Sequence, residues 1–140
     1  MFSIVMYEMI KYYRRDSRTL RNSILKADTV LMSLLLGIDL GTSSVKCSLV
    51  DADTLKITAK SSHEIDLYYP QVGYVEQSTA NWWQATRQAI QTVIVDQRPE
   101  EIIGIGFSGQ MHGTVLLDAD GQVIYPAIIW ADQRSHNVLS

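Results

Sequence analysis

Apolar and polar residues begin to alternate regularly after residue 33. Residues 34–39 form an apolar run that ends at Asp39. Residues 45–50 place an apolar side chain at every second position, namely Val45, Cys47 and Leu49. A period of two is typical of a strand with one buried face. Because a short segment rich in Gly, Thr and Ser joins the two runs, the pattern predicts a β-hairpin with Gly41 at the tight position.

The later pattern predicts a third strand, one helix and a buried strand. The third strand occupies residues 55–65, and an aromatic loop follows it over residues 66–77. Ser78 is a good N-cap for a helix over residues 79–97, and Pro99 prevents its continuation. The helix carries an apolar stripe, beside Ala89, made of Trp83, Ile90, Val93 and Ile94. Residues 101–107 are a short apolar run, which predicts a buried strand.

Short elements complete the prediction. Residues 114–117 and 123–125 read as strands on either side of a turn, and a helix begins near residue 134. Three strands, a helix and further strands indicate an α/β domain in which a helix flanks a mixed sheet. The length of 140 residues suits one domain of ordinary size.

Residues 1–31 differ from the rest of the chain. They carry six Lys and Arg against three acidic residues, whereas the remainder carries six against twelve, and they show no clean period. We expect this segment to be an N-terminal extension outside the fold, because Met32 precedes the first strand and would make a natural start. An amphipathic helix packed on the domain is the alternative. Residues 32–140 then form the domain.

Charge and cysteine content exclude several classes of partner. The formal net charge of −3 favours neither nucleic acid nor an anionic membrane surface. Cys47, the sole cysteine, cannot form an internal disulfide, which agrees with a reducing, cytoplasmic location. Its place in a strand indicates a buried thiol. No residues have the spacing of a zinc site or of a Ser-His-Asp set.

The hairpin turn is the first candidate site. It offers backbone N–H groups and small hydroxyls, and a cation lies nearby; this set is Gly41, Thr42, Ser43, Ser44 and Lys46. Such a concave group of donors suits a phosphate. Asp39, at the mouth of the turn, could hold Mg²⁺ directly or through water. The alternative is an ordinary hairpin whose turn is rich in these residue types.

Two further loops follow apolar strands and could meet the turn, because ligands collect beyond the carboxyl ends of strands in open α/β sheets. Gln110, Met111 and His112 combine an amide, a soft apolar contact and an imidazole, which suits a polyhydroxylated ligand. Asp132 and Arg134 could bind hydroxyls or pair with each other. The alternative for His112 is a loop histidine whose ring is satisfied by backbone.

These loops resemble the FGGY carbohydrate kinases. The motifs are Gly-Ile-Asp-Leu-Gly-Thr-Ser-Ser-Val-Lys at residues 37–46, Phe-Ser-Gly-Gln-Met-His-Gly at 107–113 and Pro-Ala-Ile-Ile-Trp-Ala-Asp-Gln-Arg at 126–134. The resemblance covers about residues 34–136, including Glu-Gln-Ser at 76–78 and the Trp pair at 82–83. The second motif has the form found in xylulose-phosphorylating members and differs from that of glycerol kinases.

The resemblance implies an actin-like, ribonuclease-H-like ATPase domain, present here as an incomplete N-terminal lobe. It implies ATP-dependent phosphorylation of a pentulose, D-xylulose to D-xylulose 5-phosphate. Asp39 would be the Mg²⁺-associated carboxylate, with Thr42, Ser43, Ser44 and Lys46 near the ATP phosphates. Gln110, Met111, His112 and Asp132 would lie on the sugar side. The sequence leaves a homodimer of the full-length enzyme open.

The resemblance also implies that essential parts lie elsewhere. In the family, the Asp that accepts the hydroxyl proton and the contacts to adenine come from downstream segments and a second domain. We therefore expect the chain alone to be inactive, since phosphoryl transfer also needs that base. The alternatives are a non-catalytic fragment or pseudokinase that binds sugar or pairs with a downstream chain, and a different actin-like protein such as a chaperone ATPase or a filament.

Overall fold

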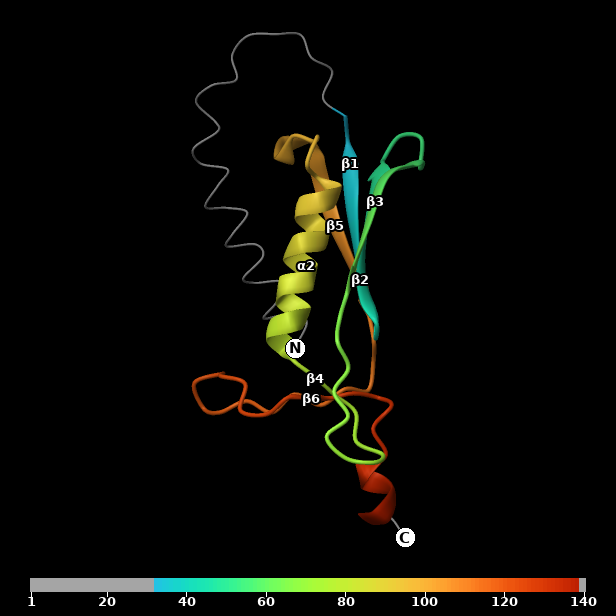
Figure 1. The fold of residues 1–140 in the computed structure, drawn as a ribbon. Helices are drawn as coiled ribbons and strands as arrows, with labels where there is room; N and C mark the ends of the chain where they lie inside the picture. The colour runs from blue at the N-terminus through green and yellow to red at the C-terminus, as the bar shows by residue number, and fades with distance from the viewer. Residues whose placement is uncertain (1–31, 139–140) are drawn as a thin grey trace.

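A computed structural model describes residues 32–138 of the chain (Figure 1). The expectation that residues 1–31 form an extension outside the fold therefore lies outside the described residues. The main sheet contains β1 (Leu34–Leu40), β2 (Ser44–Asp51), β3 (Ile57–Glu64) and β5 (Ile102–Gly109). The predicted hairpin and the strand after the helix are thus confirmed, and each boundary lies within two residues of its predicted position. The prediction that this last strand is buried is wrong, because β5 is an outer strand of the sheet, contains no buried residue and leaves Ile103 62% exposed.

The sheet is mixed, with the strand order β3-β2-β1-β5. Both β1–β2 and β2–β3 are antiparallel, whereas β5 lies parallel to β1. The crossover between β3 and β5 contains α2 (Thr79–Val93), which lies along one side of the sheet (Figure 1). A meander followed by a helical crossover places the strand β1 at the centre, so the carboxyl ends of β1 and β5 meet at one edge.

The core lies between α2 and one face of β1 and β2. The strands contribute alternate residues, as a period of two requires, namely Leu34, Leu36, Ile38, Val45, Cys47 and Leu49. The helix contributes Trp82, Ala85, Thr86, Ala89 and Val93. The predicted stripe is confirmed at Val93, which is buried, and at Ile90 and Ile94, which pack against the core. It was wrong at its first position, because Trp82 is 5% exposed and Trp83 is only half-buried. Small residues at positions 85 and 89 face the sheet and allow the close approach.

The helix begins as predicted and ends earlier. The Ser78 hydroxyl accepts a hydrogen bond of 3.3 Å from the N–H of Asn81, which satisfies a donor of the first turn. The helix ends at Val93 instead of Gln97, and turns carry the chain on to η1 (Pro99–Glu101). No helix in residues 32–138 is both long enough and apolar enough to span a membrane.

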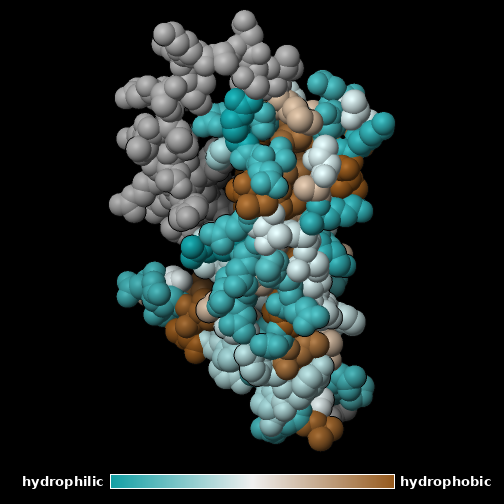
Figure 2. Space-filling model, turned by 45° about the horizontal axis from the view of Figure 1, so that its top comes forward, coloured by the Kyte–Doolittle hydropathy of each residue, from teal (hydrophilic) through white to brown (hydrophobic). Residues whose placement is uncertain are grey.

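A second, two-stranded ladder lies at the lower end of the main sheet in Figure 1. It consists of β4 (Glu76–Gln77) and β6 (Ala127–Ile128), which pair antiparallel. Between β5 and β6 the chain forms an extended arm. Figure 2 shows apolar residues on one face of the molecule in separate groups among polar ones.

The strands predicted at residues 114–117 and 123–125 do not form a ladder. Only the isolated bridges Thr114–Ile128 and Leu117–Val123 occur there. Leu117 and Val123 are each at least two-fifths exposed, so within the described residues no second layer covers the arm. The apolar residues of the arm predicted strands, but the described residues leave most of these side chains exposed. At the end of this region the chain enters η2 (Arg134–Val138), a 3₁₀ helix where a helix was expected to begin.

Candidate active site

The β1–β2 turn is closed by its own backbone. The N–H of Gly41 donates a hydrogen bond of 3.0 Å to the carbonyl oxygen of Ser44. A Cβ at position 41 would lie 3.0 Å from the same oxygen, a tight contact that glycine avoids. The amide of Gly41 is thus used within the turn, and the side chains of Thr42, Ser43 and Ser44 form the rest of its surface.

Asp39 and Lys46 lie side by side on the sheet face opposite α2. They are directly paired in the β1–β2 register, next to Ile38 and Cys47, whose side chains point into the core. Asp39 is half-exposed and Lys46 is exposed. Within residues 32–138, no hydrogen bond or ion pair reaches the Asp39 carboxylate. The carboxylate and the ammonium group are therefore both available to a ligand.

The loop after β5 starts beside the turn after β1. Leu40 and Gly109 are parallel partners, and the N–H of Gln110 donates a 2.8 Å hydrogen bond to the carbonyl oxygen of Leu40. Met111 is 71% exposed, and His112 is exposed with a φ of 59°. That backbone conformation is uncommon for a residue other than glycine. The structure thus brings the turn and the loop to the same end of the sheet.

The imidazole of His112 has no hydrogen-bond partner among the described residues. Within the described residues, the alternative in which backbone satisfies this ring therefore has no supporting contact. Met111 and His112 are both exposed, so the thioether and the imidazole face solvent beside the turn.

A hydrogen-bond network joins the turn, the loop and the segment after β6. The indole Nε1–H of Trp130 donates to the Thr42 hydroxyl at 2.9 Å, and that hydroxyl lies 3.5 Å from Oε1 of Gln110. The Nε2 of Gln110 donates to Oε1 of Gln77 at 2.8 Å. In turn, Nε2 of Gln77 donates to the Thr42 carbonyl oxygen at 2.7 Å. All three candidate loops therefore meet at one place.

Asp132 and Arg134 pair with each other, which is one of the two possibilities that the sequence analysis gave for them. Oδ1 of Asp132 accepts from the backbone N–H and Nε of Arg134, and Oδ2 accepts from Nη2 of Arg134 and from the N–H of Val75. These four bonds fill the acceptor positions of the carboxylate. Mainly the hydrogen bonds from the Arg134 side chain lower the pKa of Asp132 to about 2.

Arg134 extends this cluster toward β4. Its Nη2 lies 2.8 Å from Oε1 of Glu76, which also accepts from the Tyr125 hydroxyl at 2.8 Å. The guanidinium lies over the ring of Tyr74, 4.1 Å from its centre. Asp132 and Glu76 are nearly inaccessible. The cluster ties the end of the chain's described part to the β4–β6 ladder beside the network.

Sequence reasoning missed Gln77 and Trp130 as members of the site. Both belong to stretches that the resemblance covers, yet neither side chain was given a role. Gln77 is fully buried, and its partners Thr42 and Gln110 are 35 and 33 positions away. A polar residue between an aromatic loop and a helix N-cap was the available signal.

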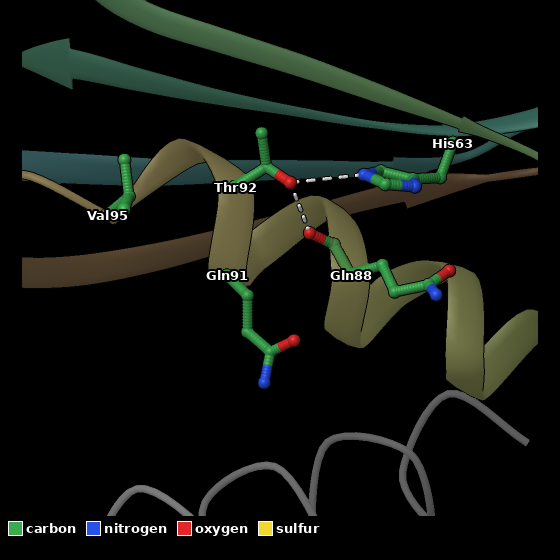
Figure 3. Close-up of a pocket in the computed structure, with 5 residues that line it drawn as sticks. All are labelled: His63, Gln88, Gln91, Thr92 and Val95. Atoms are coloured by element: carbon green, nitrogen blue, oxygen red, sulfur yellow. Dashed lines mark hydrogen bonds between the residues drawn. The ribbon is translucent and has the colours of Figure 1, made fainter.

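One hollow of the surface lies apart from these loops. It has a volume of about 410 Å³ and is lined by His63 of β3 and, from α2 and the turn after it, Gln88, Gln91, Thr92 and Val95 (Figure 3). Nε2 of His63 lies 3.2 Å from the Thr92 hydroxyl. The hollow is shallow and brings no carboxylate or cation together, so the candidate site remains the end of β1 and β5.

No group of three His, Cys, Asp or Glu side chains in residues 32–138 is placed to hold a metal ion. A resident metal cage is therefore not found in the described part. A metal that enters with a phosphate ligand needs fewer protein groups, since Mg²⁺ commonly takes one or two carboxylates and completes its shell with phosphate and water. The free carboxylate of Asp39 meets that requirement.

The sequence of the chain matches known proteins. Residues 34–140 match the N-terminal domain of the FGGY family of carbohydrate kinases. The chain is 43% identical over 106 residues to the xylulose kinase of Bacillus subtilis, covering 74% of this chain and 21% of that enzyme. The chain thus spans about one fifth of the length of the curated relatives it matches.

Solved structures agree in fold. A xyloylose kinase from Brucella ovis matches with a TM-score of 0.69 and 43% identity, over 74% of this chain and 22% of that one. A gluconate kinase from Lactobacillus acidophilus matches with a TM-score of 0.70 and 26% identity, over 77% and 22%. The mixed sheet with its flanking helix is thus part of an actin-like N-terminal lobe, as expected, and the alternative of a chaperone ATPase or filament is wrong. The chain belongs to the FGGY family of carbohydrate kinases.

Proposed function

We propose that this chain supplies one wall of the active site of an ATP-dependent kinase that phosphorylates a pentulose, converting D-xylulose to D-xylulose 5-phosphate. The observation that carries the proposal is the bond between the Gln110 N–H and the Leu40 carbonyl oxygen, which places the phosphate-type turn beside the loop that suits a sugar. Phosphoryl transfer requires the two substrates to be held in line at such a junction.

On the nucleotide side, Asp39 and Lys46 are the charged groups. The free carboxylate of Asp39 fits Mg²⁺ that arrives with ATP, and Lys46 on the same face adds positive charge near the phosphates. The hydroxyls of Thr42, Ser43 and Ser44 would line the phosphate path. Bound Mg²⁺ would neutralise phosphate charge, and the residues of the turn would orient the phosphate tail toward the sugar loop.

On the sugar side, Gln110, Met111 and His112 form the contact surface. Gln110 is half-buried and held by the network, whereas Met111 and His112 are exposed and unpaired within residues 32–138. Asp132 lies on the same side, but a sugar hydroxyl would have to displace one of its four hydrogen bonds. Its strongest contribution is to hold the segment that presents Trp130.

The similarity to xylulose kinases supports the choice of D-xylulose, and the similarity to a gluconate kinase structure makes gluconate the second substrate to test. The general base and the adenine contacts are proposed to come from outside this chain. The chain alone is therefore expected to bind but not to turn over. The free, buried Cys47 and the use of ATP agree with a cytoplasmic reaction.

The test is a chimera in which residues 34–140 replace the matching segment of the Bacillus subtilis xylulose kinase. We expect ATP-dependent phosphorylation of D-xylulose by the chimera and none by the 140-residue chain. A folded chimera that phosphorylates gluconate or glycerol in place of D-xylulose would correct the substrate, and one inactive on every ketose and polyol would refute the proposal. A thermal shift of the chain with D-xylulose but no turnover in the chimera would favour a non-catalytic sugar binder.

A further inference from the structure

Gln77 uses all of its hydrogen-bonding capacity inside the chain. Its Nε2 donates to the carbonyl oxygens of Thr42, at 2.7 Å, and of Asp66, at 3.4 Å. Its Oε1 accepts from Nε1 of Trp82, at 3.0 Å, and from Nε2 of Gln110, at 2.8 Å. A glutamine amide has two donors and two acceptor positions, so none is left over. With an exposure of 0%, Gln77 joins four separate segments of the fold.

The direction of these bonds is fixed by chemistry. An indole N–H only donates and a backbone carbonyl only accepts, so Trp82 and Thr42 permit one orientation of the Gln77 amide. Because Oε1 of Gln77 is then an acceptor, Gln110 must turn its Nε2 toward it. The Oε1 of Gln110 consequently faces the Thr42 hydroxyl, which gives its proton to Gln110 and a lone pair to Trp130.

We infer that Gln77 is a positioning residue that holds the turn at Thr42 and the loop at Gln110 in one fixed relation and sets the orientation of the Gln110 amide. One side of this junction is the proposed phosphate side and the other is the proposed sugar side, so the meaning for substrates rests on the proposed function. The mechanical coupling of the two loops does not rest on it.

A purely structural role for Gln77 would have a different signature. If its amide only satisfied the Trp82 indole in the core, its loss would lower stability and leave Trp130, which it does not touch, unchanged. Buried polar networks in which every member is satisfied do more, because each bond constrains the next. The signal that separates the two roles is therefore the state of Trp130.

The experiment uses Q77M in the 140-residue chain, with T86V as the matched control. Thr86 is buried one turn from Trp82 and donates to its carbonyl oxygen at 2.7 Å, so T86V removes a buried hydrogen bond of α2 without touching the network. The indole N–H resonances of the Trp residues are recorded by nitrogen-15 correlation spectra. We expect Q77M to shift the Trp130 indole signal and to speed its solvent exchange by about tenfold, the equivalent of one lost hydrogen bond.

T86V should lower stability and leave the Trp130 signal in place. A folded Q77M chain with unchanged Trp130 shift and exchange would overturn the inference. If Q77M does not fold, Q110M tests the same network. Gln110 is only half-buried, and its replacement removes the hydrogen bond between Gln110 and Gln77 while leaving the other bonds of Gln77 in place. Q110M should release Trp130 while the Trp82 indole stays on Gln77, and an unchanged Trp130 would again overturn the inference.

Ligand binding separates this inference from the proposed function. The chain is titrated with MgADP and, separately, with D-xylulose. We expect Q77M to bind each ligand about threefold to tenfold more weakly, because Gln77 no longer holds the two loops in one fixed position. Binding of neither ligand to the wild-type chain would count against the proposed function, and the Trp130 signal would still decide the role of Gln77. If the wild-type chain binds both ligands and Q77M binds them with the same affinities, the inference about Gln77 is refuted and the proposed function is not.

Discussion

The indole N–H of Trp130 donates a hydrogen bond of 2.9 Å to the hydroxyl of Thr42, 88 positions earlier in the chain. Trp130 as a whole residue is 59% exposed. Trp130 therefore does not serve the core, although Trp at such positions is commonly buried. Its indole N–H is held at the turn by Thr42, while more than half of the residue remains exposed to solvent.

Replacing Trp130 with Phe should separate these two properties. W130F keeps much of the apolar face and loses the N–H, so the free energy of unfolding should fall by less than about 1 kcal/mol, the lower part of the range for a single hydrogen bond. The affinity for D-xylulose should fall several-fold, because the ring is no longer held. Urea unfolding and calorimetric titration measure the two quantities.

The control is W83F, since Trp83 is half-buried on α2 and outside the network. If W130F and W83F leave sugar binding equally unaffected, Trp130 has no part in the site. A large loss of stability in W130F would show that its ring packs against more than the described contacts.

Removing the Arg134 side chain should cost more stability than removing any exposed cation. Asp132 and Glu76 are nearly inaccessible, and both would lose their cationic partner in R134M. Removing one partner of a buried ion pair leaves the other charge buried without compensation, which destabilises the folded state. Because Val75 and Tyr125 keep one bond to each carboxylate, we expect a loss of about 2–3 kcal/mol.

The comparison for R134M is K60M, an exposed position of β3 with no ion pair in residues 32–138. It should change the free energy of unfolding by less than about 0.5 kcal/mol. Equal losses in the two variants, measured by urea unfolding, would mean that the cluster contributes no more than a surface charge.

Local patterns were sufficient to predict the sheet strands, the helix start and the hairpin turn. Val45, Cys47 and Leu49 recur at every second position, and Ser78 precedes a helical stretch, so each signal lies within a few residues. On the helix, Trp83 was chosen in place of Trp82 because it shares the spacing of Ile90 and Ile94, whereas the buried face also contains Ala85, whose small size lets α2 approach the sheet.

The site was predictable only in part. Asp39, Lys46 and His112 stood out by residue type next to strand ends. The links among Thr42, Gln77, Gln110 and Trp130 join positions tens of residues apart and depend on how β1, β4, β5 and β6 meet. No spacing in the sequence encodes that meeting. The ion pair of Asp132 with Arg134 joins residues two positions apart, so the sequence could predict it as one of two possibilities for these side chains.

Cys47 should be protected from thiol reagents in the folded chain. Its side chain is 1% exposed, and burial raises the pKa of its thiol from 9.0 to about 11. The folded state therefore favours the neutral thiol, and the stability that this contributes is complete below pH 9 and is lost as the pH rises toward 11. At pH 8 the thiolate population, and with it the rate of disulfide exchange, should be lower by about a hundredfold than in the unfolded chain.

Since the chain has a single cysteine, reaction with a chromogenic disulfide reports this one site. The same protein in concentrated urea is the control and should react at once. Equal rates in the folded and unfolded chain would show that β2 opens to solvent, against the packing of α2 on it.

Substituting Gly41 by alanine should damage the turn, whereas the same change at Gly106 should not. A Cβ at position 41 would lie 3.0 Å from the carbonyl oxygen of Ser44, a backbone atom that would have to move by a few tenths of an ångström and so lengthen the bond it accepts from the Gly41 N–H. At Gly106 in β5 nothing lies within 4 Å of the added atom. We expect G41A to lower the free energy of unfolding by about 1–3 kcal/mol and G106A to be neutral or slightly stabilising.

The pair also tests where the nucleotide binds. Both variants add one methyl group, G41A in the turn that follows β1 and G106A in the neighbouring strand β5, so a general effect on the sheet would change the affinity for MgADP in both. If the turn holds the phosphates, G41A should weaken MgADP binding about tenfold or more and G106A should leave it unchanged, because only the first moves the groups around Asp39. Unchanged MgADP binding in a folded G41A chain would place the nucleotide away from the β1–β2 turn.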